Sequence, residues 1–465
     1  MNIPLIIILV YIFILFSISL ISRKYAQTNS GFVLAGRQLK TPLIMLNVVG
    51  IAIGGASTIG VSETAYKIGL SAGWYNGAWS VAAILVGYFL AGKYRAANFT
   101  TIAEFLERYY GQNCSILTVL AQIIIQVVVT ALQYIAGGSI LHALLPEVFT
   151  FELGLLTSAI VFVTTTFIGG LWSASISNIL NTTLIYFGII MATIACVSAQ
   201  GGLSNITAKL PANSPQMLDF FAGAGTATIV TWFSVMIPMV ASLQGVIQVA
   251  SSAIDTASAK RGYMLAGVLI FPMGFLSALL GIIARATFPN ATATTAMPLT
   301  IMSLDPLLAG ITLAALWAAD ISTACSMLLG ASTMLSQDIG KKIINPNLSA
   351  KASLTITRVS VLVLGSIAYF LAGKVSGILS TIMIGLSLTA AFTLLMVATL
   401  YFPSICRKSS GFYTLLAGLL TLFIWQLFPA VRILPHLIYA EWLVCISVFT
   451  LVAIFDKNKI VTPAK

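Results

Sequence analysis

The stretch VVGIAIGGASTIG, residues 48–60, places Gly50, Gly54, Gly55 and Gly60 inside an otherwise apolar segment. Each glycine destabilises a helix by about 1 kcal/mol relative to alanine. The stretch therefore predicts a helix that breaks in its middle and leaves backbone carbonyl groups free. A continuous helix whose glycines form a small-residue packing face explains the same letters equally well.

The composition around this stretch is that of a membrane protein. Of the 465 residues, 59% are hydrophobic and only 8% are charged, whereas soluble domains carry about 25% charged residues. Charge-free stretches recur along the whole chain and are long enough for helices of about 20 residues. The alternating polarity of barrel strands is absent. We predict an all-α polytopic membrane protein.

Hydropathy predicts about thirteen transmembrane helices in a single transmembrane domain, 1–465. The first, NIPLIIILVYIFILFSISLIS, lacks a basic n-region and exceeds the apolar core of about 7–15 residues of a signal peptide, so we expect it to be retained. The predicted spans lie near 3–22, 43–70, 74–92, 114–143, 149–169, 178–198, 226–250, 263–284, 304–334, 355–373, 378–402, 411–428 and 437–455.

Basic residues predict the orientation. If the loop after the first span is cytoplasmic, the 23 lysines and arginines all fall in cytoplasmic segments except Lys67, Lys209, Arg285, Lys374 and Arg432. This bias places the N-terminus outside and the C-terminus in the cytoplasm of a plasma (inner) membrane. Because the charges are scattered among short loops, membrane lipid and not nucleic acid is the expected partner.

Other motifs exclude several classes. The five cysteines lie in or beside predicted spans without CxxC spacing, which argues against a disulfide framework and a metal cluster. No Walker, HExxH or GxSxG motif is present, so neither an ATP-driven pump nor an enzyme is expected. No obligate protein partner is evident.

Two carboxylates lie at predicted membrane depth, Glu63 in the second span and Asp320 in the ninth. Such a group costs at least a few kcal/mol unless it is neutralised or paired, and it therefore indicates function. Lys67 follows Glu63 at i+4, so an ion pair explains Glu63 as well as function does. Asp320 lies deeper, and for it we favour a functional role over a protonated or snorkelling acid.

Around Asp320, the residues Ala319, Ser322, Thr323 and Ser326 share one helical face. Hydroxyl groups there can bond back to the preceding turn, and small side chains can allow close helix packing. Neutral oxygens can also coordinate a hard cation such as Na⁺. Spacing alone leaves all three open.

A second break is predicted in SVMIPMVASLQG, residues 234–245, where Pro238 removes a helical hydrogen bond. Together the two breaks put discontinuous helices in the second and seventh spans. Transporters with inverted repeats carry discontinuous spans in matching positions. We infer two inverted five-helix repeats, spans 2–6 and 7–11, with one extra N-terminal helix and two extra C-terminal helices.

Six segments in order resemble the sodium:solute symporter family. They are GFVLAGRQL (31–39), IGGASTIGVSETAYKIGL (53–70), TTIAEFLERYYG (100–111), GGLWSASISNILN (169–181), SLQGVIQV (242–249) and LAALWAADISTACSMLLGASTMLSQDI (313–339). The resemblance implies a leucine-transporter-type fold with an extra first helix (3–22), a first repeat (43–198), an inverted second repeat (226–402) and C-terminal helices (411–455).

The resemblance also implies Na⁺ as the coupling ion, bound between the broken first repeat helix and the eighth core helix. The implied ligands are the carbonyls of Gly50, Ile53 and Ala319 and the hydroxyls of Ser322 and Thr323.

The chain departs from the family pattern at a few positions. Asn178 and Asn181 stand where members with a second sodium site have a TD..Q pattern, and Cys325 precedes Ser326. We therefore expect one Na⁺ per cycle. Asp320 replaces an aliphatic residue and can add charge to the ion site, take a proton or meet a cationic substrate.

The solute is predicted less sharply. Glu63, in GVSETAY, is similar to the choline branch of the family, but Leu243 replaces a tryptophan expected there. Few, mostly neutral polar groups favour a small polar solute, although each glutamine can instead be an interhelical hydrogen bond. The residues expected to line the cavity are Ala52, Ser57, Thr58, Gln126, Gln133, Trp232 and Ser234.

The function expected from these features is a sodium-coupled symporter that imports a small polar organic solute by alternating access. The membrane potential would contribute about 2.3 kcal/mol per charge per 100 mV. Two alternatives stay open: a proton-coupled transporter of the same fold with Asp320 as carrier, and a membrane solute sensor without transport.

Overall fold

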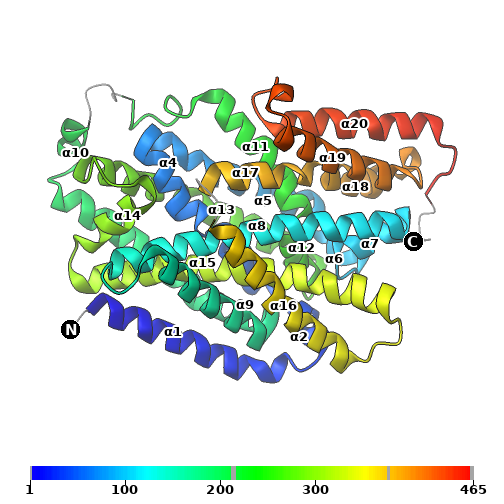
Figure 1. Cartoon of the computed structure of the whole chain (residues 1–465), viewed down its shortest axis with the longest axis horizontal. Helices are drawn as coiled ribbons and strands as arrows, with labels where there is room; N and C mark the ends of the chain where they lie inside the picture. The colour runs from blue at the N-terminus through cyan, green and yellow to red at the C-terminus, as the bar shows by residue number, and fades with distance from the viewer. Residues whose placement is uncertain (1–2, 211–215, 374–377, 461–465) are drawn as a thin grey trace.

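The computed structural model describes residues 3–210, 216–373 and 378–460, and these ranges fold as helices joined by short connections (Figure 1). No strand forms within them, where only the isolated bridges Leu39–Ala253 and Arg407–Lys459 occur. The all-α prediction is confirmed.

The helices of the first half include two short π-helical segments, η3 (Ala56–Gly60) and η5 (Gly87–Ala91). The α-helices are α1 (Ile3–Ser22), α2 (Asn29–Leu34), α3 (Thr41–Ala52), α4 (Val61–Ile68), α5 (Trp74–Val86), α6 (Gly92–Ala97), α7 (Ile102–Tyr110), α8 (Gln112–Leu144), α9 (Phe151–Ala199) and α10 (Leu203–Lys209).

The second half continues with a π-helical extension of one long helix, η6 (Leu335–Ile344). The α-helices are α11 (Gly225–Ser242), α12 (Gln244–Ser251), α13 (Thr256–Thr287), α14 (Ala293–Met302), α15 (Pro306–Met334), α16 (Ala350–Ala372), α17 (Ile378–Ser387), α18 (Thr389–Tyr401), α19 (Ser410–Leu427) and α20 (Leu437–Phe455).

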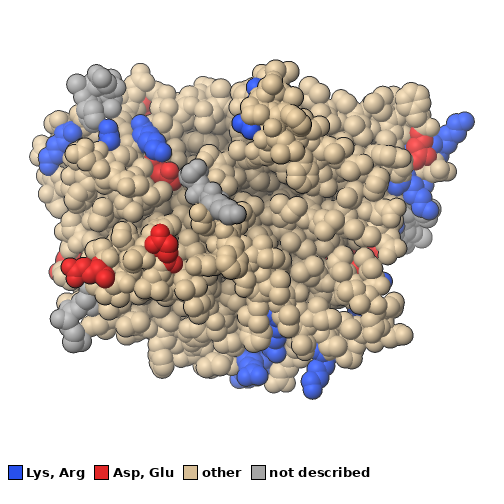
Figure 2. All heavy atoms as spheres, in the orientation of Figure 1, with Lys and Arg blue, Asp and Glu red and all other residues tan. Residues whose placement is uncertain are grey.

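Length and apolarity identify nine of the described helices as candidate membrane spans, or up to eleven when two bent pairs are each taken as one span. Figure 2 shows the outer surface that this produces: a broad uncharged area with charged side chains gathered toward its margins. The start of α1 and the end of α20 lie at opposite ends of the helices, which an odd number of crossings produces (Figure 1).

α9 runs through 49 residues, about 74 Å at 1.5 Å per residue, which far exceeds a hydrocarbon core of about 30 Å. Gly170 divides it with φ 54° and ψ −147°. As the residue numbers rise along α15, the numbers of the residues that it contacts in the first half of α9 rise too, whereas those in the second half fall. The two halves of α9 therefore run in opposite directions. The pairs are Trp317–Ser158 and Cys325–Thr165, then Thr312–Gly188 and Ser322–Asn178 across a shared cavity.

α9 thus supplies both of the spans predicted at 149–169 and 178–198. The span predicted at 74–92 is divided between α5 and η5, and α5 with 13 residues is short for a crossing helix. The total of thirteen stays a prediction, as does the inverted relation of the two five-helix units.

α15 occupies the centre of the bundle. Every residue from Thr312 to Met334 is buried, because α1, α3, α8, α9 and α16 surround it. A helix that is buried on all sides reads as apolar all round, which accounts for the uninterrupted hydrophobicity of this segment.

Two helices are broken close to α15. α3 ends at Ala52, and the pair α3 and Ala56–Ile68 bends by 56°, so the glycine-rich stretch forms the predicted break. α11 ends at Ser242, where Leu243 adopts extended backbone (φ −74°, ψ 127°) before α12 begins. This second break lies in the predicted stretch but at Leu243, not at Pro238, which stays inside α11.

Gly170→Ala tests the hairpin in α9. Its φ of 54° and ψ of −147° are accessible almost only to glycine, and a Cβ would lie 2.5 Å from the Phe32 carbonyl oxygen. We expect a loss of at least about 2 kcal/mol of stability, measured as a lower melting temperature of the purified protein. Gly111→Ala is the matched control, since Gly111 also has positive φ (86°) but nothing within 4 Å of an added Cβ. Equal melting of the two variants would contradict the close packing of α2 on the turn.

Candidate functional site

The open carbonyl end of α3 meets two hydroxyl groups of α15. Ser322 Oγ lies 2.7 Å from the Gly50 carbonyl oxygen and 2.8 Å from that of Ala319. Thr323 Oγ1 lies 3.1 Å from the carbonyl oxygens of Gly50 and Ile51 and 3.3 Å from that of Ala319. The structure therefore gathers two hydroxyls and three carbonyls, all neutral oxygens, at one buried point.

Ile53 is placed beside this cluster. It is the capping residue that follows α3, with φ −95° and ψ 82°, and its N–H donates to Val49 O at 2.8 Å. Thr323 also contacts the carbonyl of Ile51, a residue that the sequence did not indicate. The role of the Ile53 carbonyl as an ion ligand stays a prediction. Two successive carbonyls, Gly50 and Ile51, are open because the helix stops before residues 54 and 55 can bond to them.

Glycine is required where α3 approaches its neighbours. A Cβ at Gly54 would lie 2.2 Å from Thr323 Oγ1, and a Cβ at Gly50 would lie 2.8 Å from Asn178 Nδ2. The glycines therefore have both of the roles that the sequence suggested: they break the helix and they allow close packing.

A chain of neutral side chains connects α1, α3 and α9 behind the cluster. Tyr11 Oη donates to Asn181 Oδ1 at 3.0 Å, Asn181 Nδ2 donates to Asn178 Oδ1 at 3.4 Å, and Asn178 Nδ2 donates to Asn47 Oδ1 at 3.2 Å. The amide groups of Asn178 and Asn181 are thus engaged with one another and with their neighbours.

Asp320 lies on the side of α15 that faces the second half of the broken helix. The residue is completely buried, and neither carboxylate oxygen has a hydrogen-bond partner among the described residues. A Cβ at Gly55, the residue that precedes η3, would lie 2.9 Å from Asp320 Oδ1. The carboxylate therefore faces the N-terminal end of a half-helix, where the helix dipole favours negative charge.

A small central cavity of about 30 Å³ lies next to the break. Of the predicted solute residues, Ala52, Ser57 and Gln133 line it, and Thr323 joins them from α15. Gln133 also makes an interhelical hydrogen bond, since its Oε1 accepts from Gly55 N at 2.7 Å. The lining contains no charged side chain among the described residues.

The other predicted solute residues lie elsewhere. Thr58 is buried and donates to Gly54 O at 3.0 Å. Gln126 is buried against Gly245 and Gly330, two helical turns from Gln133, and Ser234 donates to Val230 O on its own helix, while its carbonyl oxygen accepts from Trp442 of α20 at 3.5 Å. The geometry gives these residues no contact with the central cavity.

Sequence reasoning missed two aromatic walls. Tyr75 and Trp79 of α5 are buried and line the central cavity. Their i, i+4 spacing puts them on one helical face and could have indicated them. Trp74, at the start of the same helix, does not line this cavity; its Nε1 donates to Phe220 O at 2.8 Å and its ring packs among phenylalanines.

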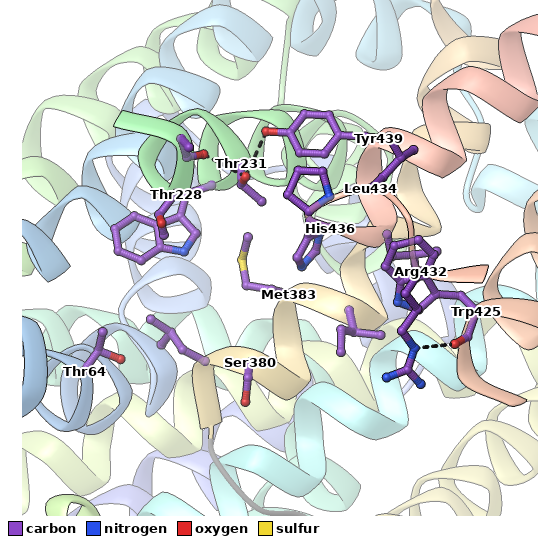
Figure 3. Close-up of a pocket in the computed structure, with 16 residues that line it drawn as sticks. Thr64, Thr228, Thr231, Ser380, Met383, Trp425, Arg432, Leu434, His436 and Tyr439 are labelled. Atoms are coloured by element: carbon purple, nitrogen blue, oxygen red, sulfur yellow. Dashed lines mark hydrogen bonds between the residues drawn. The ribbon is translucent and has the colours of Figure 1, made fainter. Parts of the chain in front are cut away.

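A second, larger cavity of about 670 Å³ lies beyond the central one, between α11, α17 and the connection from α19 to α20 (Figure 3). Trp232 lines it and meets Tyr75 edge-on, with ring centroids 6.5 Å apart. On α17, Ile382 lines the central cavity and Met383 the larger one. These side chains form the wall between the two cavities.

At the end of the bundle opposite to the larger cavity, hydrogen bonds join neighbouring segments to one another. Arg37 donates to the carbonyls of Ser251 and Phe99 at 3.0 and 3.2 Å, and Gln244 Oε1 accepts from Ile102 N at 2.8 Å. Gln248 Nε2 donates to Val33 O at 2.6 Å. The end predicted to be cytoplasmic is therefore closed by bonds between α2, the loop before α7, and α12.

At this end a further ion pair joins two segments, since Lys342 Nζ lies 2.6 Å from Glu107 Oε2 and 3.0 Å from Asp338 Oδ1. Glu63 makes a pair too: its Oε1 lies 3.5 Å from Lys67 Nζ, on a lysine side chain that is 63% exposed. This pair is the alternative that the sequence left open for Glu63, but Glu63 Oε2 is buried without a hydrogen-bond partner among the described residues, and a coupling role for Glu63 stays a prediction.

The family model described as the sodium:solute symporter family matches residues 32–418. Among the relatives, the sodium/proline symporter of Escherichia coli is 23% identical over 467 residues, covering 95% of this chain and 91% of the relative. The sodium/pantothenate symporter of the same organism is 26% identical over 389 residues, covering 78% of each chain. The osmoregulated proline transporter OpuE of Bacillus subtilis is 24% identical over 362 residues, 75% of this chain and 73% of the relative.

Solved structures show the same fold. A Na⁺-coupled sialic acid symporter in a substrate-bound outward-open state has a TM-score of 0.81 and 17% sequence identity, covering 100% of this chain and 99% of that one. A nucleobase-cation-symport-1 family transporter in a closed conformation has a TM-score of 0.62 and 12% identity, covering 92% and 94%. The leucine-transporter-type fold expected from the sequence is confirmed.

Gly54→Ala tests the closeness of α3 and α15. The added methyl group would collide with Thr323 Oγ1, so it should separate the oxygens of the cluster. The Na⁺ concentration that gives half of the maximal increase in melting temperature should rise by about tenfold. This change corresponds to about 1.4 kcal/mol of binding free energy. Gly385→Ala is the control, because a Cβ there meets only Val128 at 3.6 Å. An unchanged Na⁺ response in Gly54→Ala would show that a cation does not need this contact.

Proposed function

We propose that this chain, which belongs to the sodium:solute symporter family, imports a small polar organic solute together with Na⁺ by alternating access. The family and the relatives are membrane transporters and not enzymes. The proposal narrows that general activity to an ion site, a stoichiometry, a class of solute and an orientation.

The proposed ion ligands are the carbonyls of Gly50, Ile53 and Ala319 and the hydroxyls of Ser322 and Thr323. The observation that supports them is that each of the two hydroxyl oxygens lies within 2.7 to 3.3 Å of the carbonyl oxygens of Gly50 and Ala319. Neutral oxygens suit a hard cation, and within the described residues no cluster of three or more His, Cys, Asp or Glu offers another metal site.

One Na⁺ per cycle is proposed because the asparagine chain behind the cluster is neutral and already bonded. Asn178 and Asn181 donate to and accept from side chains of α1 and α3. Rearranging them around a second ion would break those hydrogen bonds, and a buried polar group left without a partner costs about 1–3 kcal/mol.

The solute proposed is small and polar, and the central cavity offers it only neutral polar partners. The lining offers the polar groups of Ser57, Gln133 and Thr323 against walls of Tyr75 and Trp79. A cavity of about 30 Å³ has room for only about two water molecules, at about 10–15 Å³ for each. Solute binding therefore requires these walls to separate, and the side chains between the two cavities are the ones that must move.

The proposed site of action is the plasma membrane, with the N-terminus outside and the C-terminus in the cytoplasm. Lys67 and Arg285 line one shared cavity, at the end opposite to the bonds of Arg37 and Lys342. This separation agrees with the charge bias of the loops. Lys374 lies outside the described residues.

The double variant Ser322→Ala, Thr323→Ala tests the ion site in reconstituted vesicles. Removing both hydroxyls takes away two of the proposed ligands, so the Na⁺ concentration for half-maximal uptake should rise by more than about tenfold. Selectivity among solutes should change little. The neighbouring substitution Ser332→Ala is the control, because that hydroxyl donates to Leu329 O at 3.0 Å, away from the cluster. Uptake by the double variant with the Na⁺ dependence of the wild type would refute the assignment.

Proton coupling is the second candidate function. The observation in its favour is that the Asp320 carboxylate is completely buried and has no hydrogen-bond partner among the described residues. Asp320→Asn separates the two mechanisms, because asparagine keeps the shape and cannot carry a proton. We expect uptake by this variant to be driven by a Na⁺ gradient still. Wild-type uptake that follows a pH gradient without Na⁺, and that disappears in Asp320→Asn, would replace sodium coupling by proton coupling.

A further inference from the structure

The larger cavity holds basic groups and no acidic one. Among the described residues that line its 670 Å³, Arg432 and His436 are the basic side chains, and no aspartate or glutamate takes part. Figure 3 shows His436 projecting among Thr228, Met383 and Tyr439, with Arg432 beside Trp425 at the edge of the same space. The central cavity, in contrast, has no basic lining residue.

His436 has a fixed tautomer. It precedes α20, and its Nδ1 accepts from the N–H of Ile438 at 3.2 Å. Nδ1 therefore carries the lone pair, and the proton of the neutral ring sits on Nε2 as a hydrogen-bond donor. Burial lowers the pKa of the His436 imidazole, which keeps this neutral form at physiological pH.

Arg432 is held in place by the end of α19. Its Nε donates to Trp425 O at 2.8 Å and its Nη2 donates to Gln426 O at 3.2 Å. These are carbonyls of the last helical turn, which attract a cation. A guanidinium has five N–H groups in a rigid fork, so the two bonds orient the fork and leave donors for a ligand.

The rest of the lining is largely aromatic and apolar. Trp232, Trp425 and Tyr439 form parts of the wall together with Leu379 and Met383. Tyr439 and Thr231 share a hydrogen bond of 2.8 Å, which joins α20 to α11 across the cavity. A ligand with one anionic group and an apolar body matches this combination of donors and walls.

We propose that the larger cavity is a capture site for a small carboxylate solute, with the carboxylate on Arg432 and His436 Nε2 and the apolar body against Trp425 and Trp232. Only the role of this site depends on the proposed function: the bound solute would pass from it into the central cavity through the wall made by Trp232 and Tyr75. Binding itself does not require Na⁺, since the ion cluster lies on α3 and α15.

Benzoate and benzamide are the probes, because they share a ring and differ in the anionic group. The purified full chain is titrated in potassium chloride without Na⁺, and its tryptophan fluorescence is followed. We expect saturable binding of benzoate and at least about tenfold weaker binding of benzamide, which is 1.4 kcal/mol. Trp425→Phe should remove most of the signal. Equal affinity for the two probes, or no binding of benzoate, would overturn the proposal.

Two variants test the donors independently. Arg432→Gln should abolish the preference for benzoate, and His436→Asn should weaken it while an asparagine still caps α20. Arg285→Gln, which changes a base in a different cavity, should leave the preference intact. A benzoate preference that survives in Arg432→Gln, with an unchanged melting temperature, contradicts the site.

Chloride distinguishes a carboxylate site from a general anion site. Weak competition supports the proposal, whereas displacement of benzoate by chloride at similar concentrations would make the cavity an inorganic anion site and overturn it. The double variant Ser322→Ala, Thr323→Ala should bind benzoate as the wild type does. A lack of sodium-coupled uptake would therefore refute the proposed function but not the carboxylate site. A lack of benzoate binding would refute the carboxylate site but not the proposed function.

Discussion

The contact between the open end of α3 and two hydroxyls of α15 is the interaction on which the rest of the structure depends. A helix that stops inside the bundle exposes carbonyl groups, and an unsatisfied carbonyl in an apolar interior costs several kcal/mol. Ser322 and Thr323 satisfy those of Gly50 and Ile51. The same neutral oxygens are of the kind that suits a small cation, and under the proposed function Na⁺ would replace the hydrogen bonds between these hydroxyls and carbonyls.

This contact also explains the position of α15. Its hydroxyls reach α3 from a helix that other helices surround, and every residue from Thr312 to Met334 is buried. Small side chains on both helices make the approach possible, because a Cβ at Gly50 or Gly54 would collide with its neighbours. The hydrophobicity that marks this segment as a membrane span and the polar groups within it therefore have one cause, a helix surrounded by other helices.

Sequence patterns predicted the fold class, the two breaks and the face of α15 that meets α3. The pairing of that face with α3 came from the family resemblance, whereas hydropathy and the positions of glycine and proline sufficed for the fold class and the breaks, because they reflect local free energies of burial and helix formation. They could not place the second break at Leu243, since Pro238 is accommodated in α11 while Thr393 and Ser242 donate to its carbonyl.

The lining of the cavities was harder to predict, because it depends on how helices distant in sequence are rotated against one another. The i, i+4 spacing of Tyr75 and Trp79 shows that they share a helical face but not that this face lines the central cavity. In the same way, the spacing around Ser234 does not show that its carbonyl oxygen meets Trp442 of α20. Ile51 joined the cluster for a similar reason, since the exact residue at which α3 ends decides which carbonyls are open.

Binding of radioactive ²²Na⁺ to the purified protein tests the account most directly, because it needs no knowledge of the solute. The account predicts saturable binding of about one Na⁺ per chain and its loss when Ser322 and Thr323 are both alanine. No saturable binding to the wild type, or full binding to the double variant, would contradict it.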